Sequence, residues 1–450
     1  MLLPGFPGFL DAFAGIADVV RLRTPFASER IRLCLVQLPG TERFAYLVDH
    51  PAFYDRPGSP YAVPDGSEWP DNHRRFGLFS WVAAALARGA DQGWRPDIVH
   101  AHDWHAALAP AYLAAFPPAE AHIPTLFTIH NLAYRGLFPA SLFPELALPP
   151  GFFAIDGVEF YGQVALIKAG LFYSDRLTTV SPTYAREIQT PAFGWGLDGL
   201  LRSRANRLTG ILNGVDTRVW DPGHDPLLPQ TYGLQDIVAG KRAAKAALQR
   251  RLGLETREGA PLFGAVSRLT EQKGLDLVLA GLPTLLACDG QLALLGSGDS
   301  HLEHGFAVAQ ETYRGRVGVE IAYDESLSHL IIGGSDVILV PSRFEPCGLT
   351  QLYGLRYGTL PLVRRVGGLA DTVVDATPVN LAGGDATGFA FDDDSPPALS
   401  AAVERAAALF AERDVWERIM QHAMTRDFSW DTAARQYLAL YRDLRLDLAM

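Results

Sequence analysis

Two positively charged side chains follow an apolar run beyond the middle of the sequence. In SRLTEQKGLD, Arg268 and Lys273 come after Leu262–Ser267, and Lys273-Gly274 precedes a helical pattern. Cations beside a helix N-terminus reinforce its partial positive charge, so together they can bind an anion such as a phosphate. Solvated surface cations are the common alternative. The position after a predicted strand, in a chain of net charge -11, favours the anion site.

A carboxylate follows a second apolar run, in PSRFEPCGLTQLYGL. Glu345 could bind vicinal hydroxyls or stabilise positive charge, and the backbone N–H groups of 347–350 could hold phosphate or sugar hydroxyls at a helix start. The alternative is a capping box on a structural helix, with Cys347 only packed. Cys347 has no visible His–Asp partner, so thiol catalysis is not expected.

Histidines are concentrated at two further predicted strand ends. The run HAHDWHA surrounds Asp103 with histidines, and TIHNLAYRG contains His130 and Asn131. A metal site is disfavoured, because HxHDxxH lacks the helical i, i+4 pair and a matched carboxylate. We expect Asp103 to accept hydrogen bonds from a polar ligand, and the HAHDWHA histidines to satisfy backbone groups at a helix start. His130 is either structural or, from its strand-end position, part of a cleft.

Two glycine-containing loops could let the backbone approach a ligand closely. LLGSGD includes Gly296, but GxGxxG is not met, so no dinucleotide-binding fingerprint is claimed. In GGLADTV, Asp371 could hold a base or a ribose. The alternative is an ordinary connection between a helix and a strand.

Short apolar runs alternate with helical patterns, which predicts two doubly wound α/β domains with buried parallel strands. The expected boundary lies in NGVDTRVWDPGHDP, which is dense in Asn, Gly, Asp and Pro. The predicted division is an N-terminal domain over 1–213, a second domain over 214–428, and a last helix within 429–450 that crosses back to the first domain. The predicted strands are Ile31–Leu38, Pro96–His102, Thr125–His130, Arg176–Val180, Leu208–Leu212, Leu262–Ser267, Gln291–Leu295, Val317–Ala322, Asp336–Pro341 and Leu360–Arg364. The typical predicted helices are Lys241–Leu252, Leu275–Ala287, Pro397–Glu412 and Trp430–Leu446.

Ligands of open α/β sheets bind beyond the carboxyl ends of the strands. Two such sheets that face each other form a cleft, which is where we expect the polar residues above to lie. Arginine, lysine and helix N-termini suit an anionic leaving group, whereas Glu, Asp, Asn and His suit a polyhydroxylated group. Glycosyl transfer from a nucleotide sugar needs both, and the cations would offset the charge that develops on the departing diphosphate.

Composition narrows the class of protein further. The chain has 450 residues, a pI of about 5.6 and 48% hydrophobic residues. This acidic balance argues against binding to nucleic acid or to an anionic membrane, and no apolar run is long enough to span a bilayer. Three dispersed cysteines give neither a disulfide framework nor a zinc pair, so we expect a cytoplasmic, reducing compartment. The N-terminus has no basic leader and does not resemble a signal peptide.

Several of these motifs together resemble bacterial glycogen synthase, the ADP-glucose glucosyltransferase also called bacterial starch synthase. The similar segments are 318–374, YDRPGSPY, RPDIVHAHDWHA, TIHNLAYRG, VSPTYAREI, LNGVD and SRLTEQKGLDL. The resemblance implies a two-domain GT-B fold and a retaining, metal-independent mechanism without a cofactor. The implied reaction is transfer of glucose from ADP-glucose to the 4-hydroxyl at the non-reducing end of an α-1,4-glucan such as glycogen.

The resemblance also implies roles for individual residues. Glu345 would lie beside the transferred glucose, Arg268 and Lys273 would hold the diphosphate, and His130 would face the glucose and offer its carbonyl to the transition state. The implied sugar- and nucleotide-binding set is Asp103, Asn131, Asn213, Gly296, Tyr323, Cys347, Gly348, Leu349 and Thr350.

One feature of the family has no counterpart in this sequence. The family opens with a strand and a Lys-Thr-Gly-Gly-Leu loop that lines the nucleotide-sugar site, so the first strand of the N-terminal domain is expected to be missing here. Either this sequence starts late, for example at an internal methionine, which we favour, or this form is impaired. The second explanation makes a non-catalytic glucan-binding or regulatory relative the alternative function. A phosphorylase that uses pyridoxal phosphate is a third hypothesis, but no cofactor-lysine motif is evident.

Overall fold

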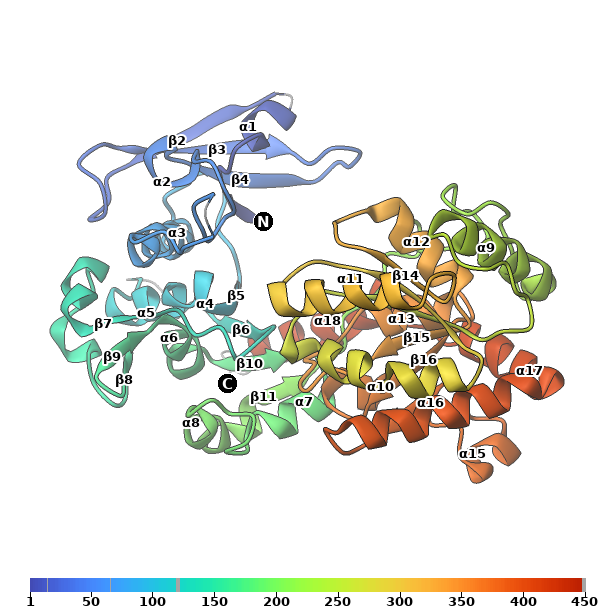
Figure 1. Cartoon of the computed structure of the whole chain (residues 1–450). Coiled ribbons are helices and arrows are strands. Elements are labelled where there is room, and N and C mark those ends of the chain that lie inside the picture. The colour runs from blue at the N-terminus through green and yellow to red at the C-terminus, as the bar shows by residue number, and fades with distance from the viewer. Residues whose placement is uncertain (14, 65, 119–121, 447–450) are drawn as a thin grey trace. The chain divides into compact units, whose positions relative to one another are not determined.

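The structure is a computed structural model that describes residues 1–13, 15–64, 66–118 and 122–446 (Figure 1). Contacts within the chain divide it into two units. The N-terminal unit contains Met1–Thr179, Ile188–Thr209 and the chain from Leu438 onward, and the C-terminal unit contains Val180–Glu187 and Gly210–Tyr437.

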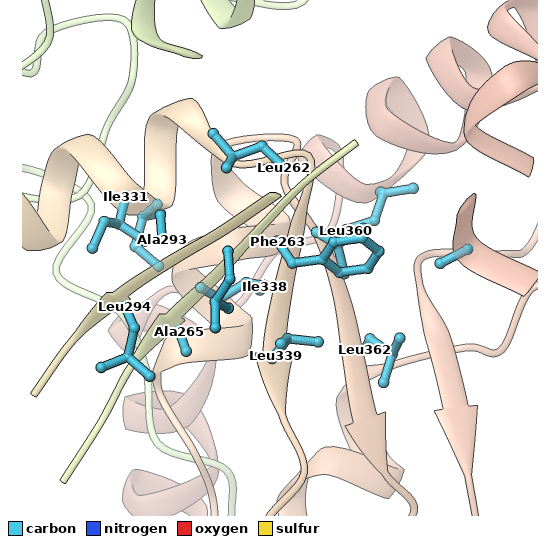
Figure 2. Packing of buried hydrophobic residues seen from close by; sticks show 14 of the residues in the cluster. Leu262, Phe263, Ala265, Ala293, Leu294, Ile331, Ile338, Leu339, Leu360 and Leu362 are labelled. Carbon is cyan, nitrogen blue, oxygen red and sulfur yellow. The ribbon is translucent and has the colours of Figure 1, made fainter. Parts of the chain in front are cut away.

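A six-stranded parallel sheet forms the centre of the C-terminal unit. Its strands follow the order β14-β13-β12-β15-β16-β17. Their side chains are almost all buried, as expected for parallel strands that are covered on both faces. Figure 2 shows this packing, with Leu294 beside Ala265, its register partner on the neighbouring strand. The strands are β12 (Leu262–Val266), β13 (Gln291–Leu295), β14 (Val317–Glu320), β15 (Val337–Val340), β16 (Leu360–Arg364) and β17 (Phe389–Phe391).

The strand order of this sheet reverses between β12 and β15. From β12 the chain proceeds outward through α10 to β13 and through α11 to β14, and it then returns through α12 to β15. Right-handed crossovers therefore place α10 and α11 on one face and α12 and α13 on the other. Consistently, α10 packs with α11 and α16, and α12 packs with α9 and α13. The helices of this unit are α7 (Pro182–Glu187), α9 (Ile237–Arg251), α10 (Leu275–Ala287), α11 (Ser300–Thr312), α12 (Glu325–Gly334), α13 (Thr350–Arg356), α14 (Gly367–Thr372), α15 (Pro378–Gly383), α16 (Pro396–Ala411) and α17 (Arg413–Met424).

The N-terminal unit contains a second sheet, in the order β11-β10-β6-β5. Its pairs β5–β6 and β6–β10 are parallel, and α4, α5 and α6 pack on one another beside α3. A small antiparallel sheet, β7-β9-β8, follows. The elements are β5 (Val99–His102), β6 (Thr125–Ile129), β7 (Leu137–Pro139), β8 (Glu159–Phe160), β9 (Gln163–Ala165), β10 (Arg176–Thr179), β11 (Leu208–Gly210), α3 (Asn72–Ala87), α4 (Asp103–Ala106), α5 (Leu108–Ala115), α6 (Leu166–Tyr173) and α8 (Asp198–Ser203).

The first segment of the chain forms a separate mixed sheet, in which one prediction is wrong. The run at Ile31–Leu38 was expected to be a parallel strand, but β3 (Ile31–Gln37) pairs antiparallel with β2 (Ala17–Leu22) and β4 (Phe44–Asp49). The reason is the short connection 38–43, which contains a Pro-Gly turn and cannot make the crossover that a parallel pair needs. β1 (Leu2–Pro4) pairs parallel with β4, and α1 (Phe9–Ala12) and α2 (Pro51–Tyr54) flank the sheet.

The last helix, α18 (Trp430–Leu446), begins in the C-terminal unit, and its part from Leu438 onward is assigned to the N-terminal unit. There the Tyr441 hydroxyl lies 2.7 Å from Nδ1 of His100, and Arg445 lies 3.6 Å from the Asp97 carboxylate. Within the described ranges, no helix combines the length and the apolar character needed to cross a membrane.

Candidate active site

A lysine–glutamate pair lies at the point where the strand order of the C-terminal unit reverses. Lys273 Nζ donates to Oε2 of Glu345 at 2.5 Å, and Ser342 Oγ donates to the same oxygen at 2.9 Å. Glu345 is only 6% exposed, so its carboxylate depends on these two donors. Lys273 follows β12 and Glu345 follows β15, which explains how residues far apart in the sequence meet at one switch point.

The two loops that carry this pair are fastened to each other. The backbone N–H of Arg343 donates to the carbonyl of Gln272 at 2.9 Å. The Arg343 guanidinium also makes two 2.7 Å hydrogen bonds to the carboxylate of Asp276, in the first turn of α10, and this contact lowers the pKa of Asp276. A bidentate pair of this kind fixes geometry as well as charge. Lys273 and Glu345 are therefore held in place by the backbone and not only by their own contact.

A pocket of about 340 Å³ opens within the C-terminal unit; neither Lys273 nor Glu345 lines it, but Arg268, which like Lys273 follows β12, and Thr350, at the helix start after Glu345, do. Arg268, Gly296, Tyr323 and Thr350 all line it, so the structure brings these four predicted residues together. Gly296 is required there, because a Cβ atom would lie 1.9 Å from the carbonyl oxygen of Ser267. The ring of Tyr323 is 90% exposed at this pocket. The remaining lining residues are Trp220, Val266, Ser267, Leu295, Ser297, Ala322, Asp324, Glu325, Ser328, Ile332 and Tyr353.

The run from Cys347 to Thr350 forms a tight turn into α13. Gly348 has a φ of 72°, and Gln351 donates from Nε2 to the carbonyls of Cys347 and Gly348 at 3.0 Å each. Burial raises the pKa of the Cys347 thiol to about 12, although a hydrogen bond from the backbone N–H of Asn213 opposes this effect. The thiol is therefore protonated near neutral pH and is a poor nucleophile. Asn213 lies against this turn, and Leu349 directly precedes the helix.

The N-terminal unit brings Asp103, His130 and Asn131 together at the carboxyl ends of β5 and β6. Oδ1 of Asp103 accepts the backbone N–H of His130 at 2.8 Å and that of Asn131 at 3.4 Å. Asp103 has a φ of 52°, the left-handed conformation that turns the chain sharply from β5 into α4. Burial raises the pKa of Asp103, whereas His130 and the two N–H groups oppose the rise. Asp103 thus orients the loop that carries His130 and Asn131.

The expectation that the HAHDWHA histidines satisfy backbone groups is wrong for two of them. His102 Nδ1 lies 3.0 Å from His130 Nε2, and His100 contacts the hydroxyls of Tyr441 and Thr128 at 2.7 and 2.6 Å. Residues i and i+2 of a strand point to the same face, so the two rings lie side by side with centroids 4.1 Å apart and contact side chains of neighbouring elements.

Asp371, suggested above to hold a base or a ribose, uses its carboxylate within the protein. Its carboxylate accepts hydrogen bonds from Ser181 Oγ and Thr183 N, both at 2.8 Å, and from Thr183 Oγ1 at 2.6 Å. These bonds fasten α7 to α14 within the C-terminal unit. By accepting the backbone N–H of Thr183, the carboxylate caps the N-terminus of the short helix α7 and has a structural role.

Several residues at this site were missed by sequence reasoning. Ser342 holds Glu345, Gln351 holds the turn before α13, and Trp220 and Tyr353 form part of the pocket. Only Trp220 had a usable signal, because a large aromatic residue is unusual in a segment so rich in Gly, Asp and Pro. The others required the folded geometry.

Among the described residues, no group of three or more His, Cys, Asp or Glu side chains is placed to hold a metal ion. Lys273 and Arg268 are instead the cations next to Glu345 and the pocket.

Comparisons with known proteins agree with this arrangement. Residues 1–203 match the family described as starch synthase catalytic domain, and residues 250–419 match glycosyl transferases group 1. The chain is 55% identical over 449 residues to the glycogen synthase of Serratia proteamaculans, covering 99% of this chain and 92% of that protein. It is 58% identical over 414 residues to the glycogen synthase of Albidiferax ferrireducens, covering 92% and 84%.

Solved structures give the same result for the fold. The catalytic domain of starch synthase IV from Arabidopsis thaliana, bound to ADP and acarbose, matches with a TM-score of 0.87 at 31% identity, over 99% of this chain and 91% of that one. Sucrose-phosphate synthase from Thermosynechococcus elongatus, at 20% identity and a TM-score of 0.55, supports the fold alone. Both units are thus Rossmann-like α/β domains of the GT-B class. The chain belongs to the bacterial glycogen synthase family and is a hexosyltransferase.

Proposed function

We propose that this protein transfers glucose from ADP-glucose to the 4-hydroxyl at the non-reducing end of an α-1,4-glucan, with retention at the anomeric carbon. The observation that carries this proposal is the contact between Lys273 and Glu345 at the switch point, together with a pocket in the same unit that Arg268 and Thr350 line. This arrangement supplies cations for a departing diphosphate and a carboxylate for a sugar within one loop assembly.

The pocket would take the nucleoside part of the donor. Its volume of about 340 Å³ suits such a group, and the exposed ring of Tyr323 offers a face for a base. Arg268 and Lys273 would then hold the diphosphate. ADP is the proposed nucleotide because the starch synthase IV structure is described with ADP bound and shares this fold.

The transferred glucose would lie between Glu345 and the turn before α13. Glu345 would accept hydrogen bonds from vicinal hydroxyls, and the N–H groups of Cys347–Thr350, with Asn213, would bind further hydroxyls or a phosphate oxygen. The buried, protonated Cys347 thiol has no covalent role in this proposal.

The N-terminal unit would supply the acceptor side. Asp103 and Asn131 carry polar groups for sugar hydroxyls, and the carbonyl of His130 would stabilise the positive charge that develops on the sugar. In this proposal the domain over 1–213 binds the acceptor and 214–428 binds the nucleotide sugar, except that Asn213, which packs with the C-terminal unit, lies on the donor side; the end of the last helix belongs with the first domain. The three free cysteines fit a reducing, cytoplasmic compartment.

The proposed glucosyl transfer needs no reagent besides the donor and the acceptor. The bond between the anomeric carbon and the diphosphate oxygen breaks with both electrons going to oxygen, and Arg268 and Lys273 offset that charge. The acceptor 4-hydroxyl oxygen bonds to the same face of the carbon and gives its proton to the departing phosphate oxygen. The products are a glucan longer by one glucose and ADP.

The test is to incubate the protein with glycogen and either ADP-glucose or UDP-glucose and to measure nucleotide release and chain extension. We expect ADP release, and an added residue that α-1,4-specific exohydrolases remove. Glu345→Gln should lower turnover by about a hundredfold or more while ADP still binds. Glycogen binding without any transfer would instead support the non-catalytic alternative.

A further inference from the structure

The 213–226 segment, which composition marks as a linker, is fixed to the C-terminal unit through the ring of Trp220. The rings of His329 and Tyr353 each have their centroid 3.8 Å from that of Trp220, with interplanar angles of 13° and 8°. Two rings that are both parallel to the indole at this distance must cover opposite faces of it. Tyr357 meets the indole edge-on at 6.1 Å.

The stacking of Trp220 between His329 and Tyr353 limits the contacts that the indole can make with a ligand in the pocket. Trp220 and Tyr353 both line it, but both faces of the indole are already covered. The indole therefore cannot stack on a ligand and can present only its edge. Its contribution is to fix the position of the pocket wall, since stacked aromatic rings stabilise each other beyond their buried area.

A buried carboxylate holds one end of the stack. Oδ2 of Asp225 accepts hydrogen bonds from Nδ1 of His329 at 2.8 Å and from the hydroxyl of Tyr357 at 2.6 Å, and Oδ1 accepts the N–H of Leu227 at 2.9 Å. Asp225 and His329 are 1% and 2% exposed. Because the buried Asp225 carboxylate needs its donors, the bond from Nδ1 stabilises the observed orientation of the His329 ring, whose buried Nε2 makes no hydrogen bond among the described residues.

The other end of the stack reaches the loop that carries Glu345. Tyr353 lies in α13, which begins at Thr350, and Gln351 of the same helix holds the carbonyls of Cys347 and Gly348. A displacement of Tyr353 would therefore alter both the pocket wall and the turn beside Glu345.

We propose that Trp220 and His329, anchored by Asp225, are positioning residues for the nucleotide of the donor, acting through Tyr353. This inference rests on the proposed function, because it takes the pocket to be the nucleotide site. Neither residue touches the reacting atoms, so neither is a catalytic residue.

The experiment compares Trp220→Leu, Trp220→Phe and a control, Trp416→Leu, in the full-length protein. Trp416 is a suitable control because it is 2% exposed in the same hydrophobic core, stacks on Phe389 and does not line the pocket. Isothermal titration calorimetry gives the Kd for ADP, and steady-state kinetics give KM and kcat. All measurements are made below the Tm of each variant.

Trp220→Leu should raise the Kd for ADP and the KM for ADP-glucose by about tenfold, with a smaller change in kcat and no change in the KM for glycogen. Trp220→Phe keeps a ring between His329 and Tyr353 and should recover most of that affinity. Trp416→Leu should lower the Tm but leave the Kd unchanged.

Equal ADP affinity in wild type and Trp220→Leu would overturn the positioning role, as would an equal loss of affinity in Trp416→Leu. A wild-type protein that binds neither ADP nor ADP-glucose would overturn the proposed function itself, and with it this inference. The two failures are therefore distinguishable.

Discussion

At the scale of single residues, Lys273 would interact with two negatively charged groups, one in the protein and one in the substrate. In the structure its ammonium group neutralises the buried carboxylate of Glu345. In the proposed reaction it also offsets charge on the departing diphosphate. Because a buried carboxylate without a counter-charge is expensive, these two roles can be separated by measuring stability and activity in the same variants.

Lys273→Ala should lower the free energy of unfolding by about 2 kcal/mol, below the range for fully buried pairs because the lysine side chain is 21% exposed. It should also weaken transition-state stabilisation by roughly 2–4 kcal/mol. The double variant Lys273→Ala/Glu345→Ala should regain stability relative to Lys273→Ala, since the unpaired carboxylate is gone, but should not regain activity. Urea denaturation and kcat/KM with ADP-glucose check this cycle. Additive losses of stability would show that the two side chains are not coupled.

At the scale of elements, most of the long buried parallel strands were predictable, whereas the short buried strand β17 and the exposed strand β2 were not. Gln291–Leu295 and Leu360–Arg364 form strands with the predicted limits, because continuous apolar runs between helices have few other solutions. β2 was missed because its side chains are mostly exposed or half-buried, so it has no apolar run. The residues of the candidate site differ in how predictable they were in a similar way. Strand-end residues such as Glu345 could be predicted, whereas Tyr353 and Asp225 depend on packing between distant segments.

The turn between η4 (Glu271–Lys273) and α10 requires glycine for two reasons. Gly274 has a φ of 70°, and a Cβ atom there would lie 2.1 Å from the carbonyl oxygen of Pro341. Gly253, after α9, has a similar φ of 67° but nothing within 4 Å. Gly253→Ala should therefore lower the free energy of unfolding by about 1 kcal/mol, and Gly274→Ala by about 3 kcal/mol or more. Activity should fall only in Gly274→Ala, because that turn positions Lys273. Similar losses in both variants would remove the steric part of the argument.

Helix α9 carries a lysine whose burial makes stability depend on pH. Nζ of Lys241 donates to the carbonyl of Ser335 at 2.5 Å and to Oγ1 of Thr359, and burial lowers its pKa to about 7 from an ordinary value of 10.5. Between these two values the unfolded chain binds more protons than the folded one, so the free energy of unfolding rises with pH.

The stability of wild type relative to Lys241→Met should therefore increase from pH 7 to pH 10, by at most about 1.4 kcal/mol per pH unit. The comparison between the two proteins cancels the titration of other groups. Urea denaturation at several pH values measures it. A stability difference that does not change over this range would contradict the lowered pKa.

At the scale of the whole molecule, the proposed chemistry is divided between the two units. Glu345, Lys273 and Arg268 belong to the C-terminal unit, and Asp103 and His130 belong to the N-terminal unit. Each set lies at the carboxyl ends of a separate sheet, and the C-terminal unit has its own large core. Transfer of glucose would need both sets of residues, whereas the proposed nucleotide site needs only one.

ADP should therefore slow backbone hydrogen exchange mainly in the C-terminal unit. The strongest protection is expected at 267–273, 296–297 and 323–328, the segments that contain Arg268, Lys273 and the pocket residues. At an ADP concentration of about 100 times the Kd, ADP stabilises the bound state by roughly 2.7 kcal/mol. Backbone amides whose exchange requires an opening that releases ADP should then exchange about hundredfold more slowly. Hydrogen-exchange mass spectrometry with and without ADP measures this, and Arg268→Ala serves as the control that should weaken the effect.

A maltooligosaccharide should instead protect the loops after β5 and β6, because Asp103, His130 and Asn131 are the proposed acceptor groups. If ADP protected those loops as strongly as the pocket, the nucleotide site could not be assigned to the C-terminal unit alone, because ligand protection reports which groups must be in place for binding.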